Sequence, residues 1–136
     1  MILLITGTRH EHCTEAIEQA VQHLLASDPA FAVLFPGGGL VVHGGAKGMD
    51  QAAQHWAILH GWTTQVIAAD WDKHGKAAGP IRNRNMAEYC LACNTPTFVL
   101  AFPHATLESK GTRGMIEICR KLGLPVTEFP VPSLPK

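Results

Sequence analysis

The sequence has no long hydrophobic run and no excess of charge of either sign. Its apolar runs are far shorter than the ~20 residues that a membrane-spanning helix needs, so we expect no membrane protein. Lys and Arg total 11, as do Asp and Glu, which makes the formal net charge zero. A neutral chain has no general field for a nucleic-acid duplex or an anionic membrane, so any anion site must be local.

Neither a secretory signal nor a disulfide framework is expected. Residues 1–5 lack a basic leading region and run directly into a polar Thr-Gly-Thr-Arg sequence, as a first strand would. Four cysteines in this context are expected to be reduced thiols, which favours the cytoplasm. Apolar residues make up 46% of the 136 residues, enough for one domain over 1–136, with a core to about 129 and a Pro-rich tail over 130–136.

Short β-rich runs alternate with stretches of helical periodicity. Strands are predicted over 2–6, 40–43, 63–69, 97–102 and 125–129, and helices begin near Cys13, Met49, Ile81 and Thr112. Segment 30–39 is ambiguous, 70–80 is predicted to be an irregular loop, and the tail is expected to add no element. This alternation predicts an α/β fold of the Rossmann-like, three-layer kind, with a parallel sheet of about five strands and helices on both faces. The strand order does not follow from the sequence.

Glycine-rich and polar loops follow three of the predicted strands. In a parallel sheet with right-handed crossovers these loops share the carboxyl edge, where ligands bind. Glycine permits close backbone approach, arginine binds phosphate in a fork, and a helix N-terminus attracts anions. The candidate ligand-binding residues of these loops are Gly7, Thr8 and Arg9, then Gly44, Gly45, Lys47, Gly48 and Asp50, and then Ser109, Gly111, Thr112 and Arg113. The alternative is that the glycines only shape tight turns.

Known phosphate-binding motifs are absent, and other chemical candidates are weaker. The sequence contains neither a Walker phosphate loop nor a Gly-x-Gly-x-x-Gly after the first strand. Cys90 and Cys93 fall on an apolar helical stripe and are interpreted as core thiols. His10, His12 and Cys13 lack a fourth ligand, so we predict neither a metal site nor a cofactor. Trp71 either stacks on a base or closes the edge of the sheet.

An ordered set of motifs resembles the YspA-type, YpsA-related branch of the SLOG superfamily. The set consists of His43-Gly44-Gly45-Ala46-Lys47-Gly48-Met49-Asp50, Trp71, His74-Gly75-Lys76-Ala77-Ala78-Gly79-Pro80-Ile81-Arg82-Asn83 and Gly111-Thr112. The resemblance implies a Rossmann-like fold related to Lonely Guy phosphoribohydrolases and DprA, a nucleotide-like ligand, and a possible homodimer. By position it implies binding roles for Arg82 and Asn83, besides the glycines, Lys47, Asp50 and Thr112. Asp50 is equally open to interpretation as a structural hydrogen-bond acceptor.

One departure from the related hydrolases bears on activity. The Lonely Guy motif Gly-x-Gly-Thr-x-x-Glu has a catalytic Glu where this chain has Met115. Glu117 lies roughly 200° further around the helix and is expected to point elsewhere. We therefore expect a nucleotide-binding or sensor module whose enzymatic status is open, with Asp50 as a weak catalytic candidate. The alternatives are an N-glycosidic hydrolase and, less favoured by the zero net charge, a protein that binds single-stranded nucleic acid.

Overall fold

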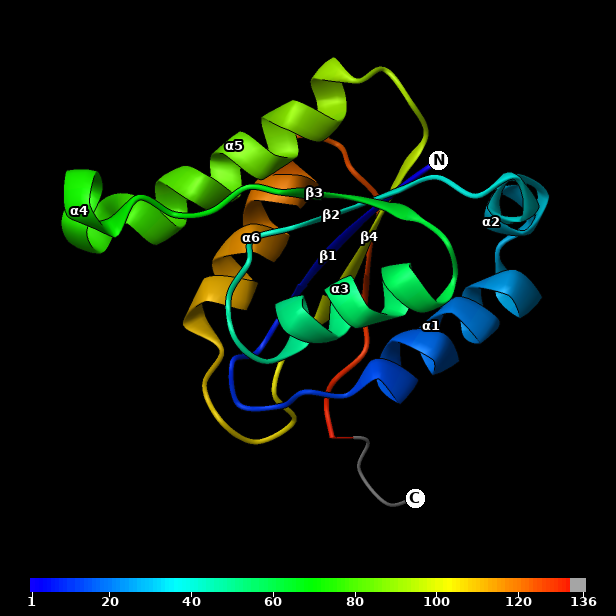
Figure 1. Cartoon of the computed structure of the whole chain (residues 1–136), viewed down its shortest axis with the longest axis horizontal. Coiled ribbons are helices and arrows are strands. Elements are labelled where there is room, and N and C mark those ends of the chain that lie inside the picture. Colours follow the sequence, from blue (N-terminus) through cyan, green and yellow to red (C-terminus); the bar gives the residue numbers. More distant parts are fainter. Residues whose placement is uncertain (133–136) are drawn as a thin grey trace.

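Five parallel strands form one sheet in the computed structural model, which describes residues 1–132 (Figure 1). The strand order is β3-β2-β1-β4-β5, so β1 lies in the middle and pairs with both β2 and β4. The strands are β1 (Ile2–Gly7), β2 (Leu40–His43), β3 (Thr63–Val66), β4 (Thr97–Phe102) and β5 (Val126–Glu128). The order reverses at β1, and the crevice beyond its carboxyl end is where such sheets bind ligands.

Helices cover both faces of the sheet, as the alternation of elements predicts. One face carries α1 (Thr14–Ser27), α2 (Pro29–Leu34) and α3 (Met49–Leu59). The other face carries α5 (Ala78–Ala92) and α6 (Lys110–Lys121). In residues 1–132 no helix combines the length and the apolar composition that crossing a bilayer requires. The chain therefore has the predicted three-layer, Rossmann-like α/β fold.

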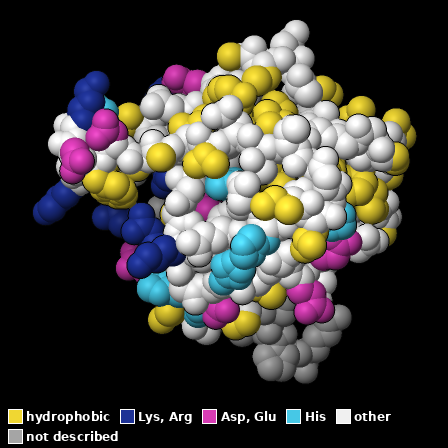
Figure 2. All heavy atoms as spheres, viewed as in Figure 1, with side chains coloured by type: hydrophobic (Ala, Val, Ile, Leu, Met, Phe, Trp, Pro, Cys, Tyr) yellow, Lys and Arg dark blue, Asp and Glu magenta, His cyan; other side chains and the backbone are white. Residues whose placement is uncertain are grey.

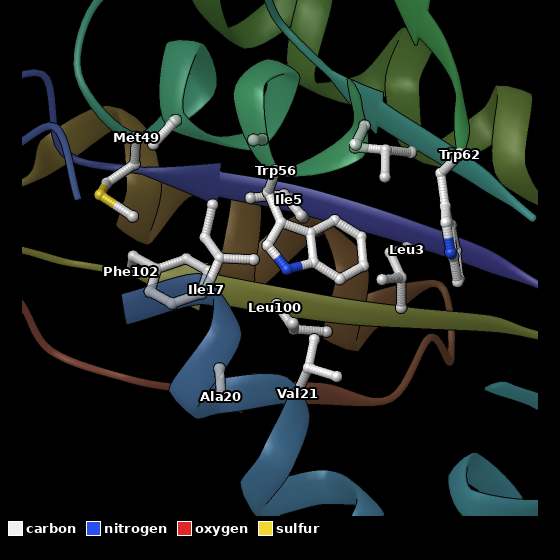
Figure 3. Packing of buried hydrophobic residues seen from close by; sticks show 14 of the residues in the cluster. Leu3, Ile5, Ile17, Ala20, Val21, Met49, Trp56, Trp62, Leu100 and Phe102 are labelled. Atoms are coloured by element: carbon white, nitrogen blue, oxygen red, sulfur yellow. The ribbon is translucent and has the colours of Figure 1, made fainter. Parts of the chain in front are cut away.

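Side chains of β1 alternate between two apolar cores, one on each side of the sheet. Leu3 and Ile5 pack on the side of α1 and α3, whereas Ile2 and Leu4 pack on the side of α5 and α6. Figure 3 shows Trp56 at the centre of the first core, between α3 and the sheet. Its indole N–H donates to Glu18 Oε2 at 2.8 Å, so burial of this large ring leaves no unpaired donor. A strand buried on both faces explains the unbroken apolar run at the start of the chain.

The segment between β3 and α5 is helical, and the prediction of an irregular loop over 70–80 was wrong. It contains α4 (Trp71–His74) and a 3₁₀ turn (Gly75–Ala77), and α5 follows directly, beginning at Ala78 rather than near Ile81. The Asp70 side chain accepts from the Lys73 N–H at 3.0 Å and caps α4. In Figure 1, α4 and the first turns of α5 project beyond the sheet as an arm.

Smaller differences concern residues near the ends of elements. The ambiguous segment forms α2 and a 3₁₀ turn (Phe35–Gly37). Cys93 is exposed, so its interpretation as a core thiol was wrong, because α5 ends at Ala92 and Cys93 lies beyond its buried face. Val131 forms an isolated bridge with His104, whereas residues 133–136 of the predicted tail lie outside the described residues.

The four free cysteines differ in environment, which predicts an order of alkylation. Burial raises the pKa of Cys90 and that of Cys119 to about 12, whereas Cys93 is exposed and Cys13 half-buried. Thiolates, not thiols, react. Iodoacetamide at pH 8 is therefore expected to modify Cys93 and Cys13 in the native protein, and Cys90 and Cys119 only after denaturation. Peptide mass spectrometry measures this, with Cys93→Ser as the control that removes one native reaction. Modification of Cys119 as fast as Cys93 would contradict the packing described.

Candidate functional site

A cleft of about 710 Å³ opens at the carboxyl ends of β1 and β4, between the arm and the start of α6. Its walls come from the loop after β1, from the arm and α5, and from the first two turns of α6. Figure 2 shows most of the visible Lys and Arg side chains on this side of the molecule, on the arm and around the notch beneath it. The volume lies within the range of small-molecule sites in proteins.

Most of the ligand-binding candidates from the sequence line this cleft. They are Gly7, Thr8, Arg9, Asp50, Trp71, Arg82, Asn83, Ser109, Gly111, Thr112 and Arg113. Gly44, Gly45, Lys47 and Gly48 are not among the lining residues. The glycines among these four residues are explained by packing within the protein rather than by contact with a ligand. Gly48 has φ +78°, and a Cβ there would meet the carbonyl oxygen of Thr8 at 2.5 Å, so glycine lets the loops after β1 and β2 touch.

The glycine-rich loop after β2 is closed by its own carboxylate. Asp50 Oδ2 accepts hydrogen bonds from the backbone N–H groups of Gly44 and Ala46, each at 3.2 Å. The Gly45 N–H donates to His43 Nδ1 at 3.0 Å. These donors are therefore not free for a ligand, which differs from the anion site that the sequence predicts at this loop. The carboxylate at the start of α3 also suits the helix dipole.

Arg82 connects this loop to α5. Its Nη1 donates to the Gly44 carbonyl at 2.9 Å, and its Nε donates to Asn83 Oδ1 at 3.0 Å. Asn83 Nδ2 in turn donates to the carbonyl of Gly111, in the first turn of α6, at 3.2 Å. A side chain at position 44 would collide with the guanidinium, so Arg82 would have to move away from its present position. The two adjacent residues of α5 thus hold the loop after β2 and the first turn of α6 in place relative to each other.

Burial shifts the pKa of both charged groups at the base of the cleft. It raises the pKa of the Asp50 carboxyl, against the opposing effect of the Ala46 N–H and the charges of His43 and Arg82. It lowers the pKa of Arg82; the Asp50 charge opposes this shift and the nearby Arg9 charge adds to it. No ion pair within 4.0 Å joins Asp50 to Arg82 among the described residues. The partly buried guanidinium is therefore positioned by neutral acceptors rather than neutralised by contact with an acid.

The first turn of α6 presents free donors to the cleft. The N–H groups of Lys110, Gly111 and Thr112 have no acceptor within residues 1–132. Ser109 Oγ accepts from the His104 N–H at 2.8 Å, which fixes the preceding loop without capping the helix. Such a terminus, with its partial positive charge, suits a phosphate or carboxylate.

Five of the chain's 11 Lys and Arg residues line this one cleft, and none has an acidic partner within 4.0 Å in the described part of the chain. They are Arg9, Lys76, Arg82, Lys110 and Arg113. The cleft also contains three carboxylates, those of Asp50, Glu108 and Glu117. Unpaired cations that converge on a concave surface favour an anionic occupant.

An aromatic side chain completes the rim. Trp71, on the arm, is 50% exposed, and the Arg9 guanidinium lies 5.8 Å from the centroid of its ring. This exposure does not fit the alternative in which Trp71 closes the edge of the sheet. A half-exposed ring at the mouth of a cationic cleft can stack on a planar group, since every base has a π face.

The cleft extends further along α6 than the sequence suggests. Met115 is fully buried in the second core, as its apolar stripe predicts. Glu117, however, lines the cleft, so the prediction that it points elsewhere was wrong. The cleft follows the flank of α6 for two turns, past Gly114, rather than ending at the helix N-terminus. Periodicity alone does not show how far a cavity reaches.

Several other lining residues were missed because they lie on elements that the sequence did not resolve. Lys76, Gly79 and Pro80 belong to the arm, whose glycines and lysines resemble those of an irregular loop. The Gly-Lys-Ala-Ala-Gly-Pro pattern was a usable signal, because Pro at the first turn of a helix is favourable. His10 also lines the cleft, and the centroid of its ring lies 6.3 Å from that of His104. The ring of His12 packs instead against that of His55. No group of three or more potential metal ligands occurs within residues 1–132.

Comparison with known proteins agrees with this architecture. The sequence profile described as "YspA, cpYpsA-related SLOG family" matches residues 1–74. The "Gene 61 protein" of Mycobacterium phage D29 is 38% identical, over 93% of this chain and 94% of its own length. The chain belongs to the YspA, cpYpsA-related SLOG family.

The role of Asp50 as an acceptor predicts different effects for two substitutions. Asp50→Ala leaves two backbone N–H groups without an acceptor and is expected to cost about 2–4 kcal/mol of unfolding free energy. Asp50→Asn retains an acceptor oxygen and is expected to cost ~1 kcal/mol or less. Urea unfolding at pH 7.5 measures both values. Equal losses in the two variants would contradict the acceptor role.

The raised pKa of Asp50 predicts that the stability of the wild type relative to Asp50→Asn depends on pH. Between the ordinary Asp pKa of about 3.9 and the raised folded value, the folded state binds more protons than the unfolded state. The unfolding free energy of the wild type relative to Asp50→Asn is therefore expected to decrease as the pH rises through this window. Urea unfolding at several pH values measures this difference. If the difference increases with pH instead, the hydrogen bonds from the backbone lower the pKa of Asp50 by more than burial raises it.

Proposed function

We propose that the cleft binds a nucleotide or a nucleotide-derived anion, and that the protein acts as a ligand-binding or sensor module. The observation that carries this proposal is the convergence of unpaired cations on the free N-terminal turn of α6. Arg9 lies close enough for its charge to contribute to the lowered pKa of Arg82, and a phosphate between the two side chains would relieve this repulsion. Membership of the SLOG family supports a nucleotide-related ligand.

The expected mode of binding follows from the chemistry of the walls. Phosphate oxygens accept hydrogen bonds from the first turn of α6 and from Arg82, and Arg113 and Lys110 lie on the same turn. A base stacks on the half-exposed ring of Trp71. The network from Arg82 through Asn83 to Gly111 holds these donors in place before the ligand arrives. Such preorganisation limits the entropy lost on binding.

A pair of neighbouring arginines tests the proposal. Arg82 lines the cleft, whereas Arg84 on the same helix is exposed and pairs with Glu88 at 3.2 Å. Arg82→Ala is expected to weaken binding of the ligand by at least tenfold, and Arg84→Ala by less than about twofold, since a charge-assisted hydrogen bond contributes about 1.5–3 kcal/mol. Thr112→Ala is expected to weaken binding as well, because Thr112 lines the cleft beside the free donors.

The ligand is found first by a thermal-shift screen against nucleoside phosphates, NAD and ADP-ribose, and calorimetry then compares the variants. A ligand at 100 times its Kd adds about 2.7 kcal/mol of stability. Absence of any shift across the panel, or equal weakening by Arg82→Ala and Arg84→Ala, would count against a site in this cleft.

Hydrolysis of an N-glycosidic bond is a second candidate, which the carboxylates in the cleft favour. Burial raises the pKa of Asp50, and burial thus favours the protonated form that a general acid needs. Release of a free base or of ribose phosphate, measured by chromatography, would favour this activity. Asp50→Asn is then expected to abolish turnover while binding is retained.

Self-association is the remaining part of the proposal. We propose a homodimer on the basis of the family resemblance, since a sensor needs a partner or a second copy to transmit its state. Light scattering after size-exclusion chromatography, with and without a ligand from the screen, measures the mass in solution.

A further inference from the structure

Two glycines in α6 have no explanation in the packing of the protein itself. A Cβ at Gly111 or at Gly114 would meet no atom within 4 Å, and neither residue has the positive φ that favours glycine. Glycine nevertheless weakens a helix relative to alanine. Gly7 contrasts with this pair, because a Cβ there would meet Met49 Cβ at 2.6 Å. The space beside Gly111 and Gly114 is the cleft, which both residues line.

A buried polar side chain beside these glycines also faces the cleft. Thr112 is only 4% exposed and lines the cleft, and its hydroxyl has no hydrogen-bond partner among residues 1–132. A hydroxyl so placed is a donor and acceptor available to a ligand that lies against the helix. The glycines allow such a ligand to approach the backbone, and Thr112 supplies a contact at the same level.

Glu117 continues this surface one turn beyond Gly114. Residues three apart on a helix are neighbours but turn back by ~60° at each step, so Gly111, Gly114 and Glu117 form a slanted row on α6, and all three line the cleft. Basic residues lie around Glu117 on the helix, at positions 113, 120 and 121, yet it forms no ion pair with them within the described chain. Arg120 instead pairs with Glu128 at 3.2 Å. The Glu117 carboxylate is therefore available to the cleft.

We infer that this flank of α6, formed by Gly111, Gly114 and Glu117, is a ribose subsite in which Glu117 accepts hydrogen bonds from the 2′- and 3′-hydroxyls. The inference rests on the proposed function and narrows its ligand to ribonucleotides. Seven residues place Glu117 ~10 Å along the axis from Lys110, and helical side chains lean back toward the N-terminus. A phosphate on the first turn then leaves the sugar beside Gly114 and its diol within reach of Glu117. A carboxylate is the usual acceptor for ribose hydroxyls.

The test compares ribonucleotides and 2′-deoxyribonucleotides. Isothermal titration calorimetry with the four pairs of nucleoside 5′-monophosphates is expected to give at least one base for which the ribonucleotide binds tenfold or more tightly. Glu117→Gln is expected to reduce this ratio to less than about threefold. Glu88→Gln, which removes an exposed carboxylate outside the cleft, is expected to leave the ratio unchanged. Equal affinity of the wild type for both sugars, or an unchanged ratio in Glu117→Gln, overturns the inference.

Gly114→Ala provides a second measurement that does not depend on the charge of Glu117. The added methyl group enters open space in the free protein, so the melting temperature is expected to stay the same or to rise by a few degrees. Binding of the ribonucleotide is expected to weaken tenfold or more, because the methyl group occupies the position of the sugar. Unchanged affinity in this variant overturns the inference even if nucleotides bind. If none of the eight nucleotides binds the wild type, the inference fails, and the proposed function fails with it only if NAD and ADP-ribose do not bind either.

Discussion

The hydrogen bond from Arg82 to the Gly44 carbonyl connects elements that the sheet alone does not hold together. Gly44 belongs to the loop after β2 and Arg82 to α5, on the opposite face of the sheet from α3. Through Asn83 the same network reaches α6, so three crossover connections meet at one small group of polar contacts. A guanidinium in this position is partly desolvated, and this cost is offset only if its acceptors are fixed. The buried carboxylate of Asp50 fixes the loop that supplies the main acceptor.

The two glycine-rich loops look alike in the sequence but differ physically. The loop after β2 is filled by a carboxylate of its own helix, whereas the N-terminal turn of α6 has no acidic residue and keeps its donors free. The charge of the side chain in the first turn distinguishes the two cases, since an acidic residue there accepts hydrogen bonds from the N–H groups that a ligand would otherwise use. This difference is visible in the sequence, because the first turn of α3 contains Asp50 and the first turn of α6 contains Lys110.

Periodicity and turn residues predicted the five strands, the four long helices and the edge of the sheet at which the polar loops meet. They did so because a strand buried on both faces, such as β1, and an amphipathic helix, such as α1, have patterns set by local geometry. Strand order, the arm and the extent of the cleft depend on contacts between distant segments. Trp71, Lys76 and Glu117 reach one cleft from three elements, which are α4, the 3₁₀ turn after it and α6. Whether the residues of the cleft bind a ligand stays a prediction.

The placement of charge in a neutral chain has a consequence for encounter with solutes. The cleft has five cationic and three acidic side chains, so the rest of the surface must hold a compensating negative excess. The cleft is therefore a positive part of a molecule whose remaining residues are negative on balance. In the field of an approaching anion the protein experiences a torque that turns the cleft toward the anion. This effect acts within about a Debye length, ~8 Å at physiological ionic strength. A protein without net charge therefore promotes the encounter by turning its cleft toward the anion rather than by attracting the anion from a distance.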